Sequence, residues 1–95
     1  MHVISRSRIV EFCKTYPEAY EPLDRWYRIT CDAEWDNFAE LRIAFGSADK
    51  VGPYVVFNIG GNKYRLVAEI FFTHKVALIR AILTHGEYDD DDWKG

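Results

Sequence analysis

The stretch YVVFNIGGNKYRLVAEIFF, residues 54–72, decides the fold of this chain. On both sides of Gly60-Gly61 the residues alternate in polarity and are rich in β-branched and aromatic types, which is typical of strands. A pair of glycines between two such runs indicates a two-residue hairpin turn. Lys63 and Arg65 follow the turn two residues apart, a spacing that puts both cations on one face of a strand. We therefore predict a hairpin that carries two cations on one face.

The flanking segments extend this hairpin to an α+β domain. VALIRAIL, residues 76–83, predicts the last strand of a three-strand meander, joined to the hairpin by a short turn at Thr73-His74. Before the hairpin, residues 2–5 predict a short first strand, and apolar residues then recur at helical spacing in three segments. The third helix begins after Asn37, whose side chain and that of Glu40 form a capping pattern. We expect the helices to pack on one face of a mainly antiparallel sheet.

The two faces of the sheet can be separated if both turns hold two residues. The apolar face, which must meet the helices, then carries Val55, Phe57, Ile59, Tyr64, Leu66, Ala68, Ile70, Ala77, Ile79, Ala81 and Leu83. On the opposite face Lys63 lies across from Asn58, while Arg80 lies across from Val67 and diagonal to Arg65. Three cations would thus converge on an exposed sheet face.

The composition bounds the class of protein. The 95 residues are 48% hydrophobic, enough for one domain with a substantial core. No apolar run approaches the roughly 20 residues of a membrane span, and the N-terminus lacks a signal peptide, so we expect a cytoplasmic protein without membrane contact. Cys13 and Cys31 have no metal-ligand spacing, so we expect small buried thiols, no metal site and no cofactor.

The net charge of −3 is unevenly distributed. Leaving Lys94 out of 12 basic residues and Asp89–Asp92 out of 15 acidic residues gives 11 of each over residues 1–88. The deficit therefore comes from the end of the chain, where a run of like charges is usually a solvated tail. We divide the chain into a single domain, residues 1–88, and an acidic C-terminal tail, residues 89–95.

The stretch THGEYD, residues 84–89, adds titratable groups beside the cations. His85 can serve as an acid or a base near neutral pH, and Tyr88 can stack on a nucleobase or share a proton. Such a group could cleave RNA without metal, because a ribose 2′-hydroxyl can attack the neighbouring phosphorus while cations stabilise the developing charge. Cations on an exposed sheet face are most often only solvated, so these residues leave an enzyme, a binding module and a plain solvated face all open.

Two blocks, VVFNIGGNKYRLV (55–67) and RAILTHGEYD (80–89), together resemble the HigB-type toxins of bacterial type II toxin–antitoxin modules, which belong to the RelE superfamily. The resemblance runs from residue 1 to about residue 89 and includes MHVISRSRIVEFCKTYPEA and AEWDNFAEL. It implies a RelE-like fold and an mRNA interferase, an endoribonuclease that inhibits translation by cutting messages, in many relatives on the ribosome. It also implies a cognate antitoxin, which we expect to carry a helix-turn-helix.

By position, the resemblance implies catalytic roles for Arg65, Arg80, His85 and Tyr88, and RNA or phosphate binding for Lys63, Asn58 and Asn62. Because both arginines are assigned to the exposed face, shortening them is expected to leave the fold nearly intact. The chain has Gly86 where the family leads us to expect alanine, and this glycine would loosen a loop that holds His85. The alternative function is a module that blocks translation by occupying the ribosome without cutting.

Overall fold

The computed structural model describes residues 1–90 and 93. Five strands form one sheet in the order β1-β5-β4-β3-β2. They are β1 (His2–Ile4), β2 (Asp49–Val51), β3 (Tyr54–Ile59), β4 (Tyr64–Phe71) and β5 (Val76–Thr84). Only β1 pairs in parallel, with β5, and the other pairs are antiparallel. The α+β class and the mainly antiparallel sheet with its meander are confirmed, whereas β2 is a strand that the sequence analysis missed.

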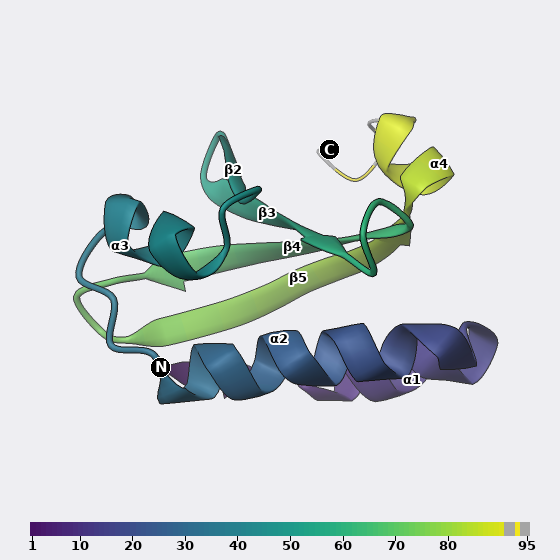
Figure 1. The fold of residues 1–95 in the computed structure, drawn as a ribbon, viewed down its shortest axis with the longest axis horizontal. Helices are drawn as coiled ribbons and strands as arrows, with labels where there is room; N and C mark the ends of the chain where they lie inside the picture. The colour runs from purple at the N-terminus through teal and green to yellow at the C-terminus, as the bar shows by residue number, and fades with distance from the viewer. Residues whose placement is uncertain (91–92, 94–95) are drawn as a thin grey trace.

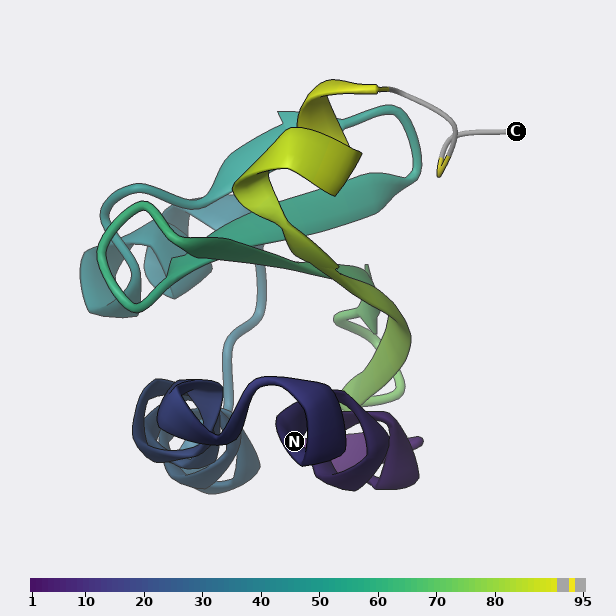
Figure 2. The ribbon, with the colours of Figure 1, turned by 90° about the vertical axis from the view of Figure 1, so that its right-hand side faces the viewer.

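The helices lie on both sides of this sheet. They are α1 (Ser7–Thr15), the short 3-10 helix η1 (Pro17–Ala19), α2 (Tyr20–Asp32), α3 (Phe38–Ala44) and α4 (His85–Asp89). α1 and α2 run side by side beneath one face, and α4 stands over the opposite face at the end of β5 (Figures 1 and 2). We call the face toward α1 and α2 the inner face and the other the outer face.

The core fills the space between the inner face and the helices. Its largest fully buried side chains include Trp26, Phe57, Leu23, Leu41 and Leu66. The Trp26 and Phe57 rings meet edge to face, with centroids 5.4 Å apart, and so join α2 to β3. The assignment of the residues from Val55 to Ile70 to the inner face is therefore correct, because each of these inner-face residues belongs to or packs against this core.

Both hairpin turns are longer than predicted, and the longer first turn changes the register between β3 and β4, whereas the pairs next to the second turn keep the predicted register. Ile59 pairs with Tyr64, so the first turn holds residues 60–63, and Gly60 and Gly61 adopt φ of 62° and 72°. Glycine adopts these left-handed angles without steric cost. Asn58 consequently pairs with Arg65 and not with Lys63, which belongs to the turn. The second turn holds residues 72–75, because Phe71 pairs with Val76.

A β-bulge at Arg80 overturns part of the predicted face assignment. Val67 pairs with Ala81 and Ala68 pairs with Ile79, which leaves Arg80 without a pairing partner on β4. An extra residue of this kind reverses the side-chain alternation beyond it. Ile82 therefore packs against the core, and Ala81 and Leu83 lie on the outer face and not on the inner face.

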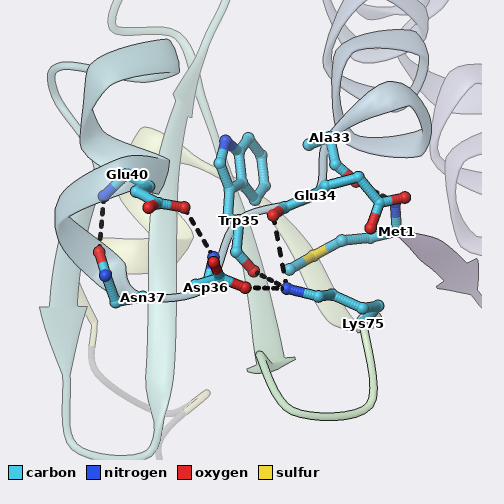
Figure 3. A network of polar contacts seen from close by, with 8 residues as sticks. All are labelled: Met1, Ala33, Glu34, Trp35, Asp36, Asn37, Glu40 and Lys75. Carbon is cyan, nitrogen blue, oxygen red and sulfur yellow. Dashed lines mark hydrogen bonds and ion pairs between the residues drawn. The ribbon is translucent and has the colours of Figure 1, made fainter.

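The loop between α2 and α3 is fixed by ammonium groups that cap its carbonyls (Figure 3). Lys75, at the end of the second hairpin turn, donates to the Glu34 and Trp35 carbonyls and pairs with the Asp36 carboxylate. The Met1 ammonium donates to carbonyls at the end of α2, including that of Ala33. These contacts place α3 beside β2, where it borders the outer face.

The Asn37 side chain caps α3 through the Glu40 amide at 2.9 Å, as predicted, but the Glu40 carboxylate returns to the Asp36 amide. Cys31 is exposed and Cys13 is partly buried, so the prediction of buried thiols is wrong for Cys31. Within residues 1–90 and 93, no helix has both the length and the apolar character that a bilayer crossing requires.

Candidate active site

Arg65 is the centre of the polar cluster on the outer face. Its residue is only 7% exposed, and its two terminal nitrogens point four N–H groups at protein acceptors. Nη1 donates to the Asn62 carbonyl at 3.2 Å and the Tyr64 carbonyl at 3.1 Å. Nη2 donates to the Asn62 Oδ1 at 2.6 Å and lies 3.0 Å from the His85 Nδ1. The guanidinium therefore binds both the hairpin turn and the first residue of α4.

The contacts of His85 define its tautomer. A guanidinium only donates, so the His85 Nδ1 beside Arg65 must accept and carry no proton. The proton of the neutral ring then lies on Nε2, which is 3.2 Å from the Asp89 Oδ2. Arg65, His85 and Asp89 thus lie in a row, in which Arg65 hydrogen-bonds one ring nitrogen and the Asp89 carboxylate lies near the other.

Local capping explains why His85 occupies this position. Thr84 caps α4 by accepting from the Glu87 amide, and the Glu87 carboxylate accepts from the Thr84 amide, which completes a capping box. The His85 amide also donates to the Lys63 carbonyl at 3.0 Å. His85 therefore lies in a capped helix that is tied to the first hairpin turn, and the expectation of a loop loosened by Gly86 is wrong.

Tyr88 covers the guanidinium from the other side. The Arg65 Cζ lies 5.5 Å from the centre of the Tyr88 ring, a cation–π contact. Trp93 stacks on Tyr88 with ring centroids 5.1 Å apart and donates to its carbonyl. The aromatic ring predicted to contact a nucleobase thus lies between the central cation and Trp93.

Lys63 and Arg80 do not join this cluster. Lys63 belongs to the first hairpin turn and not to a strand, and no hydrogen bond or ion pair of its ammonium with the Arg65 cluster occurs among the described residues. Arg80 lies on the outer face, but its guanidinium is paired with Glu69 at 2.5 Å, beyond Val67. The predicted convergence of three cations is wrong, because the longer turn and the bulge separate them.

A hollow of about 450 Å³ adjoins the cluster on the outer face. Arg65, Tyr88 and Asn58 border it on one side, and Arg42 of α3 and Lys50 of β2 border it on the other. The sequence analysis missed Lys50, since a three-residue strand carries too little alternation to be recognised, and it missed Arg42 because the helical pattern of α3 does not show that this helix borders the outer face. The hollow therefore extends the positive charge of Arg65 toward α3.

The sequence analysis also missed Asp89, which it placed in the tail. The signal was present, because Thr84-His85-Gly86-Glu87 is a capping-box sequence that predicts a helix start. In a helix, His85 and Asp89 are four residues apart and lie on the same side. Asp91 and Asp92 of the predicted tail lie outside the described residues, and within those residues no group of three or more His, Cys, Asp or Glu side chains could hold a metal ion.

Together the fold and the site define a small α+β protein with a cationic, histidine-bearing outer face suited to a phosphate-rich ligand. The chain belongs to the HigB toxin family, described as a RelE-like toxic component of a toxin–antitoxin system, whose model matches residues 19–91. This confirms the resemblance found in the sequence, and it implies a cognate antitoxin.

Similar proteins extend over nearly the whole chain. The mRNA interferase HigB of Escherichia coli O6:H1 (strain CFT073) is 32% identical over 92 residues, which cover 94% of this chain and 89% of that protein. The mRNA interferase toxin HigB of Escherichia coli (strain K12) is 30% identical over 92 residues, covering 94% of this chain and 88% of that protein.

Proposed function

We propose that this toxin is a metal-independent endoribonuclease that cuts mRNA and thereby inhibits translation and growth. The observation that carries the proposal is the contact of Arg65 with His85 and Tyr88 on the outer face. The names of the similar proteins, mRNA interferases, support the same activity. The substrate is therefore a polyanion that the Arg65 cluster can bind through phosphate.

In the proposed reaction the ribose 2′-oxygen attacks the adjacent phosphorus and the 5′-oxygen leaves. Arg65 stabilises the negative charge that develops on the phosphoryl oxygens in the transition state. Stabilisation of this kind by a preorganised donor is usually the largest single contribution to the rate. His85 moves a proton, and Tyr88 can share a proton through its hydroxyl, or stack on a neighbouring base after Trp93 moves aside. Asn58 and Asn62 border the phosphate, and Lys63 and Arg80 act from the rim, after Arg80 leaves Glu69.

The hollow beside the cluster gives the message a path across the outer face. Arg42 and Lys50 are placed to meet phosphates on one side of the cleaved bond. Because the chain as a whole carries a charge of −3, its electrostatic attraction for free RNA is limited. A ribosome in the cytoplasm that presents the message would make a high affinity for free RNA unnecessary. We therefore place the reaction on ribosome-bound mRNA.

The partner that silences the toxin must keep RNA away from the outer face. We propose a small antitoxin with a helix-turn-helix that covers this face or holds the toxin off the ribosome. Expression of the chain alone should arrest growth, and expression of the antitoxin with it should restore growth. Normal growth with abundant, folded toxin would contradict this role.

Primer extension on messages isolated after brief expression tests the reaction itself. Cleavage should leave new 5′-hydroxyl ends inside coding sequences. In a translation reaction, purified toxin should still cut the message after a chelator is added at a concentration that leaves the ribosomes intact. The His85→Gln variant, which is folded but cannot transfer the proton, is the control. Intact messages on stalled ribosomes would indicate occlusion without cutting, and activity restored only by one divalent ion would exclude the metal-free reaction.

A further inference from the structure

All four N–H groups on the terminal nitrogens of Arg65 have acceptors in the structure, and one of these acceptors is the His85 ring. Three of the four on its terminal nitrogens hold the hairpin turn, through Asn62 and the Tyr64 carbonyl. The fourth lies on the His85 Nδ1 at 3.0 Å. This fourth N–H can be withdrawn without disturbing the turn, because His85 belongs to a different element.

The same contact also blocks the only lone pair of the imidazole. With its proton on Nε2, His85 can act as a base only through Nδ1, and Nδ1 is occupied by the guanidinium. Arg65 as a phosphate ligand and His85 as a base are therefore coupled. The His85 Nδ1 cannot accept a proton until the hydrogen bond between them breaks, and breaking it also frees an Nη2 N–H of Arg65 for phosphate.

We propose that RNA phosphate takes the fourth N–H of Arg65 from His85, so that substrate binding itself releases the His85 Nδ1 as the general base, with Asp89 as its positioning residue. This inference rests on the proposed function and deepens it. Asp89 is 3.2 Å from Nε2 on the far side of the ring, where it holds the ring orientation and stabilises the imidazolium that forms.

The 2′-hydroxyl gives its proton to the His85 Nδ1 as the bond from the 2′-oxygen to phosphorus forms. The bond from phosphorus to the 5′-oxygen breaks, and that oxygen takes a proton from water. The imidazolium later returns its proton to solvent, and Arg65 rebinds Nδ1 when the cyclic phosphate end leaves. Until substrate arrives, the base is held inactive by the residue that will bind the substrate.

Among the described residues, two charged groups contact the ring and two further charged or titratable residues lie next to it. Arg65 reaches it from β4 and Asp89 from α4, Tyr88 lies over Arg65, and the turn residue Lys63 supplies a carbonyl to the His85 amide. Of these, only Asp89 is an anion in contact with the ring. Replacing it should therefore change proton transfer more than it changes the fold.

Nitrogen-15 spectra of the histidine rings test the release directly. The full chain should show His85 as the Nε2–H tautomer, identified by its loss in the His85→Gln variant. An RNA oligonucleotide methylated at every ribose 2′-oxygen cannot be cut, because it lacks the attacking hydroxyl. Its addition should move the Nδ1 signal toward the position of an unprotonated ring nitrogen that accepts no hydrogen bond. A His85 that is protonated or of the Nδ1–H form in the free toxin, or a signal that the bound oligonucleotide leaves in place, would overturn the proposal.

Cleavage kinetics test Asp89. The Asp89→Asn variant should lose on the order of 10²-fold in kcat, as expected for impaired acid–base catalysis, with little change in KM. The Asp90→Asn variant is the matched control, because it removes the same charge from the next residue, which does not touch the ring. If Asp89→Asn cuts at the wild-type rate, the inference is wrong but the nuclease activity is unaffected. If the wild type does not cut RNA, the proposed function is wrong, and the nitrogen-15 spectra alone then test whether RNA releases the His85 Nδ1.

Discussion

Arg65 shows how one residue can be structural and functional at once. Its guanidinium is buried, yet its charge faces the hollow beside Tyr88. We predict that Arg65→Ala lowers both the cleavage rate and the stability, because the Asn62 and Tyr64 carbonyls lose their donor. An unsatisfied buried polar group costs about 1–3 kcal/mol. Urea unfolding and cleavage of the same preparation measure the two effects.

Two variants separate the causes. Arg65→Lys keeps the charge but cannot supply the forked donors, so it should remain nearly as inactive as Arg65→Ala. Arg80→Ala should change stability by no more than about 1 kcal/mol, since its side chain is half exposed and paired at the surface with Glu69. A stable Arg65→Ala variant would show that the guanidinium does not hold the turn, as the sequence first led us to expect.

The Tyr64–Glu18 hydrogen bond, 2.6 Å long, predicts a pH-dependent stability. It lowers the pKa of Glu18 and raises the pKa of Tyr64 to about 12. A lowered carboxyl pKa stabilises the fold above its ordinary value of 4.5, and this contribution is lost as the pH falls through the folded-state value. A raised tyrosine pKa stabilises the fold below its ordinary value of 10.0, and this contribution is lost as the pH rises toward 12.

We therefore predict that Tyr64→Phe unfolds at a lower temperature than the wild type at neutral pH. The difference should shrink in acid below the ordinary pKa of Glu18 and again in alkali above the ordinary pKa of Tyr64. Thermal unfolding from pH 3 to pH 11 measures it. An equal difference at every pH would mean that the phenol contributes by packing against α1 alone.

At the scale of elements, α4 is short and its position depends on capping. Gly86 lies inside it, and nothing lies within 4 Å of the place where a Cβ would stand. We predict that Gly86→Ala stabilises the protein by about 0.5–1 kcal/mol, because alanine has fewer conformations to lose on folding. Urea unfolding measures the gain, and Thr84→Ala, which removes the N-cap, should shift it the other way by about 1 kcal/mol. A destabilised Gly86→Ala variant would contradict the helix.

The elements also show how far the sequence determines the site. Periodicity located α1, α2, the first hairpin and β5, because each repeats one pattern over many residues. The cluster depends on features without such repetition: turn length, which decides that Asn58 pairs with Arg65, and one extra residue at Arg80. A shift of one residue moves a side chain to the other face, so these details had to come from three-dimensional pairing. The sequence predicted that His85 lies near the cationic face, but it did not predict the hydrogen bond between His85 and Arg65.

At the scale of the whole molecule, three basic side chains are concentrated around the hollow on the outer face. The chain is acidic overall, yet Arg42, Lys50 and Arg65 border one hollow, in which Asp49 is the acidic lining residue. Local concentration of this kind attracts a polyanion even when the net charge is negative, and it acts over about a Debye length. Figure 2 places α1 and α2, with their own ion pairs, on the side away from this face.

The basic side chains around the hollow predict how RNA binding depends on salt concentration. Lys50→Gln and Arg42→Gln should each weaken the binding of an uncleavable RNA oligonucleotide similarly across sequences, and each should reduce the slope of log K against log salt by about 0.7 if the residue meets one phosphate. Lys14→Gln on α1 is the matched control, since it removes the same charge from the opposite side of the sheet and should leave the slope unchanged. Titrations at several salt concentrations measure all three. If Lys14→Gln lowers the slope as much as Lys50→Gln, the RNA responds to net charge and does not lie in the hollow.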